Sequence, residues 1–593
     1  MKKRLLLLAT VAVLMALGSS LSAQTESRGD TLLIGPLNSD GEPLGALNEA
    51  ILGDTTATGE RQHKVYKLQR GAQYILTEII NADFPLVIVA DKPDDNNRPP
   101  VIRTGLNEAG ETVGLWWRLF DNATFKNLWM SGINLEGTGP ISWISQEVNT
   151  TNKTIRYEGC IFEFPYTWWA MFADWGSLNS YFITDCVFKN IGNPTGATWN
   201  GAIFNGGTMD SVVIKNTTFY NFGCFALHTS NGIYYAEVDH CTFVNSVVHP
   251  MNNHRGIKQI ITNNLFVNVH AFSDDLDEIK RHFDQEVKGI INYAEIQWDP
   301  VQLDSLWGPG GAYGKNYDPN GDGKLTPDEL VIELKNNAWW YTQPIKDYWD
   351  QFPEVVANPW MNNYNQAMFD NKTADWTWSV MTYERDTNDV IIDSTEVIME
   401  HKPFEFFVEE NTMNLDPGIV NMNGTDALLA QNSINIRKEW AGETIPDSEK
   451  VKFHGVDDYL AFTWPFDFDL SYTNETLLTG STSGGPVGSL QWFPIPTNVF
   501  QPGAAKVAFG LSQNYPNPFS HTTTISYTVV RESMINIDIY NSIGARVATL
   551  VNETRQPGDY SVTFDGTNLS NGIYFLQMKS SHQIDSKKMM LMR

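Results

Sequence analysis

The chain has 593 residues, a length that suggests about four domains at roughly 150 residues each. Hydrophobic residues make up 42% and charged residues 19%, which is enough apolar material for a large core and excludes an intrinsically disordered chain. The formal net charge of −28 excludes a protein that binds nucleic acid through a broad basic face, so we expect no nucleic-acid partner. Because both ends of the chain are net basic, the acidic excess lies in residues 24–500.

Residues 1–23 have the three-part pattern of a secretory signal peptide. Residues 2–4 are basic, residues 5–17 are apolar, and small, mostly polar residues follow up to Ala23. The apolar run is too short to span a bilayer, and no other stretch reaches the ~20 apolar residues that a membrane-spanning helix needs. A buried N-terminal helix is the alternative. We therefore expect an exported protein whose mature form has no transmembrane segment.

A repeat of short β-type segments runs through residues 155–270. Phenylalanine recurs in it at intervals of 23–31 residues, and in four of five repeats asparagine follows two positions later. The two columns are Phe162, Phe188, Phe219, Phe243 and Phe266, and Asn190, Asn221, Asn245 and Asn268. Units of this length indicate coils that bury one face against their neighbours, whereas propeller blades need ~40 residues. The pattern predicts an all-β fold, a right-handed parallel β-helix, and resembles the architecture of pectate lyases and related enzymes.

The coil pattern divides the middle of the chain. We expect the N-terminal part of the β-helix over residues 24–272, with its first clear strands between Tyr74 and Asp91. A partly helical insertion, rich in Trp and acidic residues, is expected over 273–403, and a continuation of the β-helix with loops over 404–500. Residues 501–507 are expected to be a linker.

Three of the four cysteines fall in one inward column of the repeat: Cys160, Cys186 and Cys241. Neighbours on parallel strands have poor geometry for a disulfide, so we expect buried thiols that act as small core residues. Two disulfides in an exported chain are the alternative.

The end of the chain has short alternating strands separated by Gly, Asn and Pro, which predicts a small C-terminal β-sandwich. It carries Asn-Tyr-Pro-Asn-Pro-Phe at 514–519, Tyr-Asn at 540–541 ahead of Gly544, and Gly-Ile-Tyr-Phe at 572–575. In these motifs residues 508–593 resemble the type A C-terminal sorting domain of the type IX secretion system. The resemblance implies the type IX secretion machinery as a partner and a secreted or outer-membrane-surface location. An appended carbohydrate-binding sandwich is the alternative.

Residues 318–329 have the spacing of a calcium-binding loop. Oxygen-bearing side chains occupy positions 1, 3 and 5, glycine position 6, a carbonyl donor position 7 and an acid position 12. The predicted ligands are Asp318, Asn320, Asp322, Lys324 and Glu329. The loop resembles EF-hand and dockerin-like structural sites, which implies Ca²⁺ as a cofactor, and we expect a helix over residues 327–335. An acidic turn without an ion is the alternative.

Polar residues precede several repeats at positions that would form an outward ladder. We assign candidate catalytic residues and candidate substrate-binding residues to it, with Ala173 as the alternative to Asp174 in the ladder. The catalytic set is His228, His249, Arg255 and Lys258, and the substrate-binding set is Asp174, Asn205 and Asn252. A lyase that acts on uronic acids needs a base for the C5 proton and a cation that neutralises the carboxylate. A glycoside hydrolase needs two carboxylates, and the motif pattern of β-helical polygalacturonases is not reproduced here, which disfavours a hydrolase of that type. The alternative to a lyase is a polar edge that binds sugar hydroxyls or water.

The chain contains 19 Trp, 22 Tyr and 31 Phe. Aromatic faces flanked by Asn and Asp suit stacking on sugar rings, although Trp is more often buried, so we expect a mixture of core and sugar-binding Trp. The residues concerned are Trp116, Trp117, Trp143, Trp168, Trp169, Trp175, Trp199, Trp339, Trp340, Trp349, Trp360, Trp376 and Trp378.

Together these patterns predict an exported surface or extracellular protein that binds polysaccharide, with a polysaccharide lyase as the candidate activity. The alternative is a non-catalytic, glycan-binding or adhesin-like surface protein. The acidic excess favours neutral glycans, or acidic glycans bridged by calcium.

Overall fold

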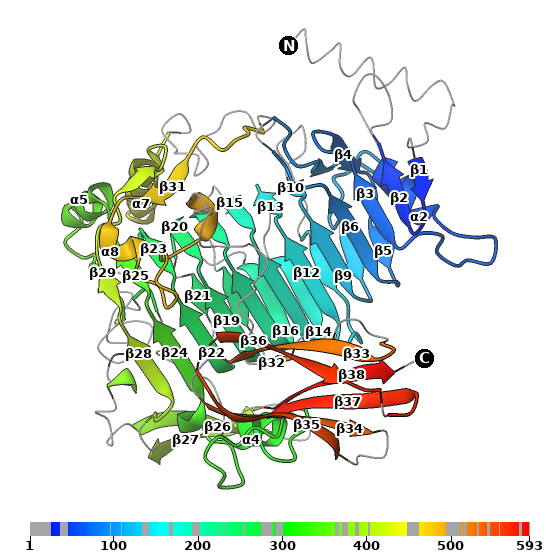
Figure 1. Cartoon of the computed structure of the whole chain (residues 1–593). Helices are drawn as coiled ribbons and strands as arrows, with labels where there is room; N and C mark the ends of the chain where they lie inside the picture. Colours follow the sequence, from blue (N-terminus) through cyan, green and yellow to red (C-terminus); the bar gives the residue numbers. More distant parts are fainter. Residues whose placement is uncertain are drawn as a thin grey trace, which may run out of the picture. The chain divides into compact units, whose positions relative to one another are not determined.

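The chain folds into two compact units, Met1–Phe493 and Pro494–Arg593, in a computed structural model (Figure 1). The structure describes residues 25–35, 46–94, 96–107, 109–132, 142–164, 170–191, 202–223, 226–229, 232–248, 250–252, 255–273, 289–291, 300–361, 366, 368–370, 377–385, 391–400, 404–446, 462–493, 510–511, 514, 519–529, 533–541, 546–556, 558–567, 569–579 and 584–591.

The first unit is built from coils that contribute up to three short strands each, and these form three rows. The first-row strands are β5 (Ile80–Ala82), β8 (Trp117–Leu119), β11 (Ile144–Gln146), β14 (Ala170–Thr184), β16 (Ala202–Lys215), β18 (Leu227–Thr229) and β21 (Met251–Asn252). The long strands β14 and β16 continue into the second row, which also contains β2 (Thr31–Ile34), β3 (Val65–Leu68), β6 (Leu86–Ala90), β9 (Ala123–Lys126), β12 (Thr154–Glu158), β19 (Ile233–Asp239), β22 (Gly256–Thr262), β24 (Val331–Lys335) and β28 (Phe407–Glu410). The third-row strands are β4 (Gln73–Leu76), β7 (Val101–Thr104), β10 (Trp129–Ser131), β13 (Ile161–Glu163), β15 (Val187–Ile191), β17 (Thr218–Phe222), β20 (Thr242–Ser246), β23 (Leu265–Val267), β25 (Ala338–Trp340) and β29 (Met413–Asn414).

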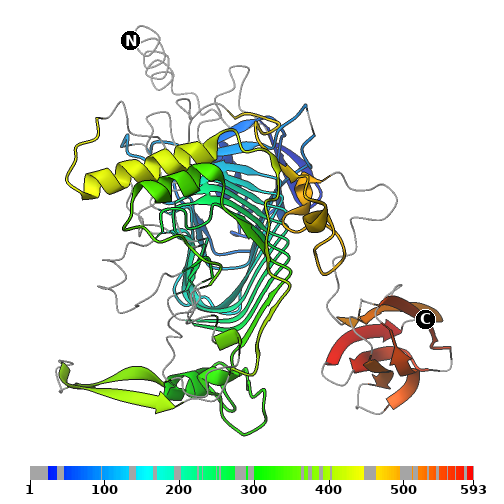
Figure 2. The same cartoon turned by 90° about the vertical axis from the view of Figure 1, so that its left-hand side faces the viewer.

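Strands of one row pair in parallel with their counterparts in neighbouring coils (Figure 1). Among the described residues, the first two rows and the antiparallel edge strand β1 (Thr25–Arg28) together form a sheet of 17 strands, and the third row forms a sheet of 10 strands. Viewed along the stack, the rows enclose the core (Figure 2). The chain is thus mostly β, with long parallel sheets that are consistent with a β-helix-like fold.

The phenylalanine column of the repeat forms a stacked ladder inside the coils. Phe188 is in register with Phe162 on one side and with Phe219 on the other. Ring centroids of successive phenylalanines, from Phe162 to Phe266, are 4.5–4.9 Å apart. Offset stacking adds to the area that each ring buries, so the ladder holds the coils in register. The next residue of the column is Trp339, which pairs with Phe266.

The asparagine column makes the corner that follows the third row. Asn190, Asn221, Asn245 and Asn268 all have φ between 53° and 59°, a left-handed conformation that Asn adopts more readily than most residues. Their side chains are buried and bond to each other along the stack. The Asn245 amide donates to Asn221 Oδ1 at 3.1 Å and accepts from the Asn268 amide at 3.0 Å. Each coil therefore turns at a residue that also links it to its neighbours.

The coils begin earlier and continue further than the sequence pattern indicates. Strand β2 already pairs in parallel with β3, ahead of the expected start at Tyr74, and helix α2 (Ala46–Leu52) lies between them in sequence. Strands β24 and β25 form a complete coil inside the expected insertion 273–403. The repeat pattern misses this coil because Trp339 replaces phenylalanine at the repeat position and comes 73 positions after Phe266. The expected coil after 404 is present as β28 and β29.

The segments between these coils are partly helical. They include α4 (Pro300–Trp307), the 3-10 helix η1 (Pro327–Glu329), α5 (Gln343–Gln351) and the antiparallel pair β26 (Thr377–Arg385) and β27 (Ile391–Glu400). Helix α7 (Thr425–Trp440) lies beside α5, where Arg437 Nε donates to the Tyr348 hydroxyl at 2.6 Å (Figure 2).

Residues 462–493 cover the outer face of the third row, and we call them the strap. They contain β31 (Asp469–Tyr472), which pairs with β30 (Ile419–Asn421), then α8 (Glu475–Leu478) and the 3-10 helix η2 (Leu490–Trp492). Phe462 packs against Trp129, with ring centroids 5.3 Å apart, and Phe468 stacks on Tyr220 at 4.0 Å. The strap thus buries an outward apolar column that the coils alone would expose.

Cys160, Cys186 and Cys241 are free and buried, as the column predicts, while Cys224 lies outside the described residues. Burial raises the pKa of the Cys186 and Cys241 thiols well above the ordinary value, so both stay protonated and act as small core residues.

The second unit consists of two antiparallel sheets that share one core. One sheet contains β32 (Gly510–Leu511), β33 (Thr522–Val529) and β36 (Gly558–Asp565). The other contains β35 (Arg546–Arg555), β34 (Ser533–Asn541), β37 (Gly572–Lys579) and β38 (Ile584–Leu591). Alternate residues such as Ile525, Ile537 and Leu576 point into the core between them.

The asparagine corner leads to a stability prediction. Asn245→Ala removes buried hydrogen bonds, about 1–3 kcal/mol, and adds about 1–2 kcal/mol for a left-handed residue with a Cβ, whereas Asn245→Gly loses only the bonds. We therefore expect melting temperatures, measured by near-ultraviolet circular dichroism, to fall in the order wild type, Asn245→Gly, Asn245→Ala. Asn411 has φ 56° but an exposed side chain, so Asn411→Ala measures the backbone cost alone. Equal melting temperatures for the two Asn245 variants would contradict the corner argument.

Candidate functional site

The first row aligns polar residues in one column across its strands. Asn205 on β16 is in register with His228 on β18, and His228 is in register with Asn252 on β21. In the other direction the column continues through Ala173, Ser145, Arg118 and Asn81. We call these seven positions the polar column. The side chains of Asn205, His228 and Asn252 lie outside the described part of the structure, so the backbone register is what places them.

The N-terminal end of the polar column faces outward. Asn81 is exposed and Arg118 is half-buried, while the residues on either side of each, such as Trp117 and Leu119, are buried. Arg118 donates from a guanidinium NH2 group to Asn81 Oδ1 at 3.4 Å. Because side chains alternate along a strand, the positions in register with them point to the same side of the sheet, although Ser145 and Ala173 are buried there. Arg118 and Asn81 escaped the sequence interpretation because the repeat has no phenylalanine marker before residue 155.

Asp174 lies outside the polar column, because Ala173 is the residue in register with Asn205. The Asp174 side chain is 3% exposed, and its Oδ1 accepts from the Gly176 amide at 2.7 Å and from the Asn179 side chain at 3.1 Å. Neighbouring Gln146 is also buried, and neither of its side-chain polar atoms has a hydrogen-bond partner among the described residues. Burial raises the pKa of Asp174. Burial therefore opposes ionisation of Asp174, while the hydrogen bonds that it accepts from Gly176 and Asn179 favour the ionised form.

The remaining candidate catalytic residues are distributed differently. His249 lies outside the described residues. Arg255 is half-buried at the turn between the first and second rows, and its carbonyl accepts from the Ile233 amide at 3.2 Å. Lys258 belongs to the second row, with its Nζ 4.3 Å from the centre of the Tyr317 ring and 5.4 Å from that of Tyr234. Burial lowers the pKa of Lys258. The structure thus separates Lys258 from the column that contains His228.

The aromatic cluster beside Lys258 holds the segment after α4 against the second row. Trp307 stacks on Tyr234 with centroids 5.8 Å apart, and Lys315 forms an ion pair with Asp210 on β16. The Tyr313 hydroxyl is 3.2 Å from Thr208 Oγ1. This segment leads directly into the calcium-type loop.

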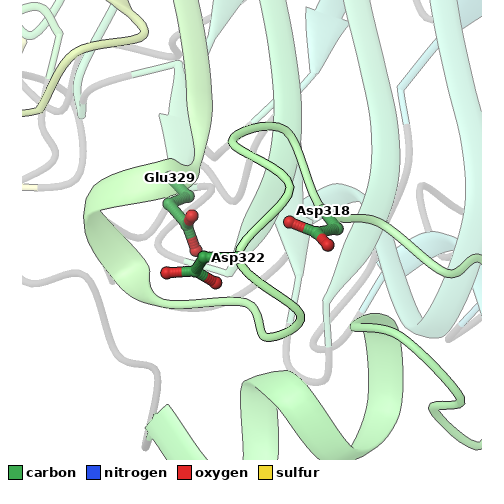
Figure 3. A group of neighbouring side chains, drawn as sticks. All are labelled: Asp318, Asp322 and Glu329. Atoms are coloured by element: carbon green, nitrogen blue, oxygen red, sulfur yellow. The ribbon is translucent and has the colours of Figure 1, made fainter.

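The loop at 318–329 brings three carboxylates together (Figure 3). Oxygens of Asp318, Asp322 and Glu329 lie within 4.8 Å of one another. Asp318 accepts from the Gly321 amide at 2.7 Å and from the Gly323 amide at 3.1 Å, and both glycines have positive φ. These bonds fold the chain around the three acids, as a tight cation loop requires.

Glu329 supplies the observation that tests whether a cation fits. The residue is 2% exposed, and its Oε2 accepts from the backbone amide and the hydroxyl of Thr326 at 2.6 and 2.9 Å. Its Oε1 is buried and has no hydrogen-bond partner within the described part of the chain. An oxygen of this kind is costly without a ligand, so the donor set fits a hard divalent cation. Asn320 Oδ1 accepts from the Asp322 amide, within the same loop.

The segment after the loop is not the helix expected over 327–335, and that prediction was wrong. One 3-10 turn, Pro327–Glu329, is followed by the strand β24, because residues such as Ile332 and Leu334 pair with coils on both sides. The loop is anchored at its other side, where the amide of the buried Leu325 donates to Asp304 on α4 at 2.7 Å. The loop therefore joins α4 to a coil strand.

The tryptophans whose side chains are described include both buried and exposed residues. Trp116, Trp117 and Trp143 are fully buried in the coils, whereas Trp175 is 51% exposed at the end of the first row. The side chains of Trp168, Trp169, Trp199, Trp376 and Trp378 lie outside the described residues.

Comparison with known proteins concerns the second unit. Residues 513–592 match the family of secretion system C-terminal sorting domains. The chain therefore carries a type IX sorting domain, which interacts with the secretion machinery and directs the protein out of the cell, to the cell surface or the extracellular space. Neither the curated proteins nor the solved structures gave a match to this chain. Within the described residues, no helix is long and apolar enough to cross a membrane.

Asp174 generates a prediction about pH. A carboxyl whose pKa is raised in the folded state binds more protons than the unfolded chain, so its contribution to stability is complete below about pH 3.9 and is lost as the pH rises through the raised value. We expect Asp174→Asn to abolish this loss. The free energy of unfolding, measured from pH 4 to 8, should therefore fall less steeply with pH for Asp174→Asn than for wild type, with the exposed Asp83→Asn as the matched control. Identical slopes would contradict a raised pKa of Asp174 in the folded state.

Proposed function

We propose that this exported protein is a right-handed parallel β-helix that binds polysaccharide along its first row. The observation that carries the proposal is the polar column, in which Asn205, His228 and Asn252 follow one another on neighbouring strands. Parallel strands lie about 4.8 Å apart, a spacing comparable to the length of one sugar residue, so a chain lying along the stack would meet Asn205, His228 and Asn252 in three successive coils. The right-handed sense is supported by the strong preference for right-handed connections between parallel strands.

The proposed polar column leads to a prediction about glycan binding. Because a sugar hydroxyl bonded to a side chain contributes about 1–1.5 kcal/mol, we expect His228→Ala and Asn252→Ala each to weaken glycan binding about tenfold. Affinity electrophoresis of the full-length protein in gels that contain neutral or acidic polysaccharides measures this. His521→Ala, an exposed histidine of the sorting domain, is the control and should bind like wild type. Unchanged binding by both first-row variants would exclude the polar column as the site.

Cleavage is a second candidate function, and one observation favours it. Burial lowers the pKa of Lys258, which suits a residue that abstracts a proton, and Arg255 lies three residues earlier. A lyase of this kind releases unsaturated products that absorb ultraviolet light from uronic-acid polymers. Absorbance that appears with wild type and not with Lys258→Met supports the lyase. Retained binding without absorbance supports the non-catalytic, adhesin-like alternative.

We also propose that the loop at 318–329 binds Ca²⁺, with Asp318, Asn320, Asp322 and Glu329 as side-chain ligands and Lys324 as a carbonyl ligand. The support is the convergence of three carboxylates and the unpartnered Oε1 of Glu329. Its role would be structural, because the loop connects α4 to β24 and so braces the segment that packs on Tyr234.

The calcium proposal predicts a stability change. At a Ca²⁺ concentration about 100 times the dissociation constant, binding adds about 2.7 kcal/mol to the state that binds. We expect Ca²⁺ to raise the melting temperature of wild type and to have no effect on Asp318→Asn or Glu329→Gln. The exposed Glu354→Gln is the matched control and should respond like wild type. A wild-type melting temperature that EDTA and Ca²⁺ leave unchanged would overturn the proposal.

A further inference from the structure

Two exposed aromatic side chains stand at equivalent positions two coils apart on the first row. Leu119, Gln146 and Asp174 are in register through their strands β8, β11 and β14. The residues that directly follow them in three successive coils are Phe120, Glu147 and Trp175. Phe120 is 40% exposed and Trp175 is 51% exposed. We call these three residues the aromatic strip.

The spacing of the strip follows from the pairing of its strands. Phe120 and Trp175 belong to coils separated by one intervening coil, so they are about 10 Å apart along the stack. Glu147 stands between them and pairs with Arg118 of the polar column, with Arg118 Nε 3.2 Å from Glu147 Oε1. The strip thus lies two residues along the chain from the polar column and adjoins it on the same outer face.

Most of the charged side chains around the strip form ion pairs with each other. Arg118 is bound to Glu147, and Lys153 is bound to Asp121 at 2.8 Å, while Asp83 is exposed one coil before Phe120. This edge therefore presents two cations and three carboxylates. An anionic polymer would have to break an ion pair to gain a cation there and would meet a net negative surface.

We propose that the aromatic strip binds a neutral, β-1,4-linked glycan of the cellulose or mannan type. In such a chain each ring is turned by about half a revolution from the last, so every second ring presents the same face. Phe120 and Trp175, at alternate coils, stack on rings n and n+2, and the Glu147–Arg118 pair bonds hydroxyls of ring n+1. This inference rests on the proposed polysaccharide binding, and it favours the non-catalytic alternative because a neutral glycan has no acidic C5 proton.

The test compares oligosaccharides that differ in one property at a time. We expect the full-length protein to bind neutral β-1,4-linked hexamers, and to bind dimers much more weakly because a dimer reaches only one platform. Comparison with a β-1,3-linked hexamer tests whether binding requires the two-ring repeat of the β-1,4 linkage. Comparison of a β-1,4-linked mannuronate hexamer with the matching mannose hexamer tests whether negative charge on the sugar weakens binding. Titration calorimetry measures each affinity, and a change in tryptophan fluorescence that is present in wild type and absent in Trp175→Phe reports contact at Trp175.

The variants separate this inference from the proposed function. Trp175→Ala and Phe120→Ala should each weaken hexamer binding about tenfold and reduce the ratio of hexamer affinity to dimer affinity. Trp175→Phe should retain most of the hexamer affinity of wild type. Phe575→Ala, which removes an aromatic side chain of similar exposure (43%) from the sorting domain, should bind like wild type. Binding to mannuronate that depends on His228 but not on Trp175 would overturn the strip while leaving the polar column intact. Binding to no glycan at all would overturn both.

Discussion

The register between successive coils is the constraint on which the rest of the molecule depends. A coil has little core of its own, and it is stable only when its inward side chains stack on those of its neighbours. The stacked rings from Phe162 to Phe266 favour one alignment, and so do the hydrogen bonds between the side-chain amides of Asn221, Asn245 and Asn268. A slip of one residue would turn every inward side chain outward. The polar column and the aromatic strip exist only because this alignment carries each position unchanged from coil to coil.

The sequence predicts the repeated part of this fold well, for a physical reason. Phenylalanine and asparagine recur in it because one inward position needs a stacking ring and one corner needs a left-handed residue with an amide side chain. The prediction was less accurate where the residue type at a repeat position changed but the geometry of the coil did not. Trp339 fills the ring position after a long gap, and β2 starts the stack without either marker.

The candidate sites were predictable to different degrees. The loop at 318–329 is local, so the spacing of its residues was sufficient to place three carboxylates together, although the strand that follows depends on pairing with distant coils. The polar column was predicted for Asn205 and His228 from spacing, but Asp174 and Ala173 differ by one residue, and spacing cannot say which of two neighbours faces outward. The surroundings of Lys258 could not be predicted, because Tyr317 reaches it from a segment 59 residues later.

The strap gives the first unit an order of completion. Its residues 462–493 follow every coil in the chain, yet they cover Val101, Trp129, Ile161 and Val187, which belong to early coils. A ribosome or an export channel that releases the chain from its N-terminus therefore delivers the coils with this apolar column still open to water. The column closes only when nearly the whole first unit has emerged, so any factor that shields nascent chains has a defined surface to occupy and a defined moment to leave.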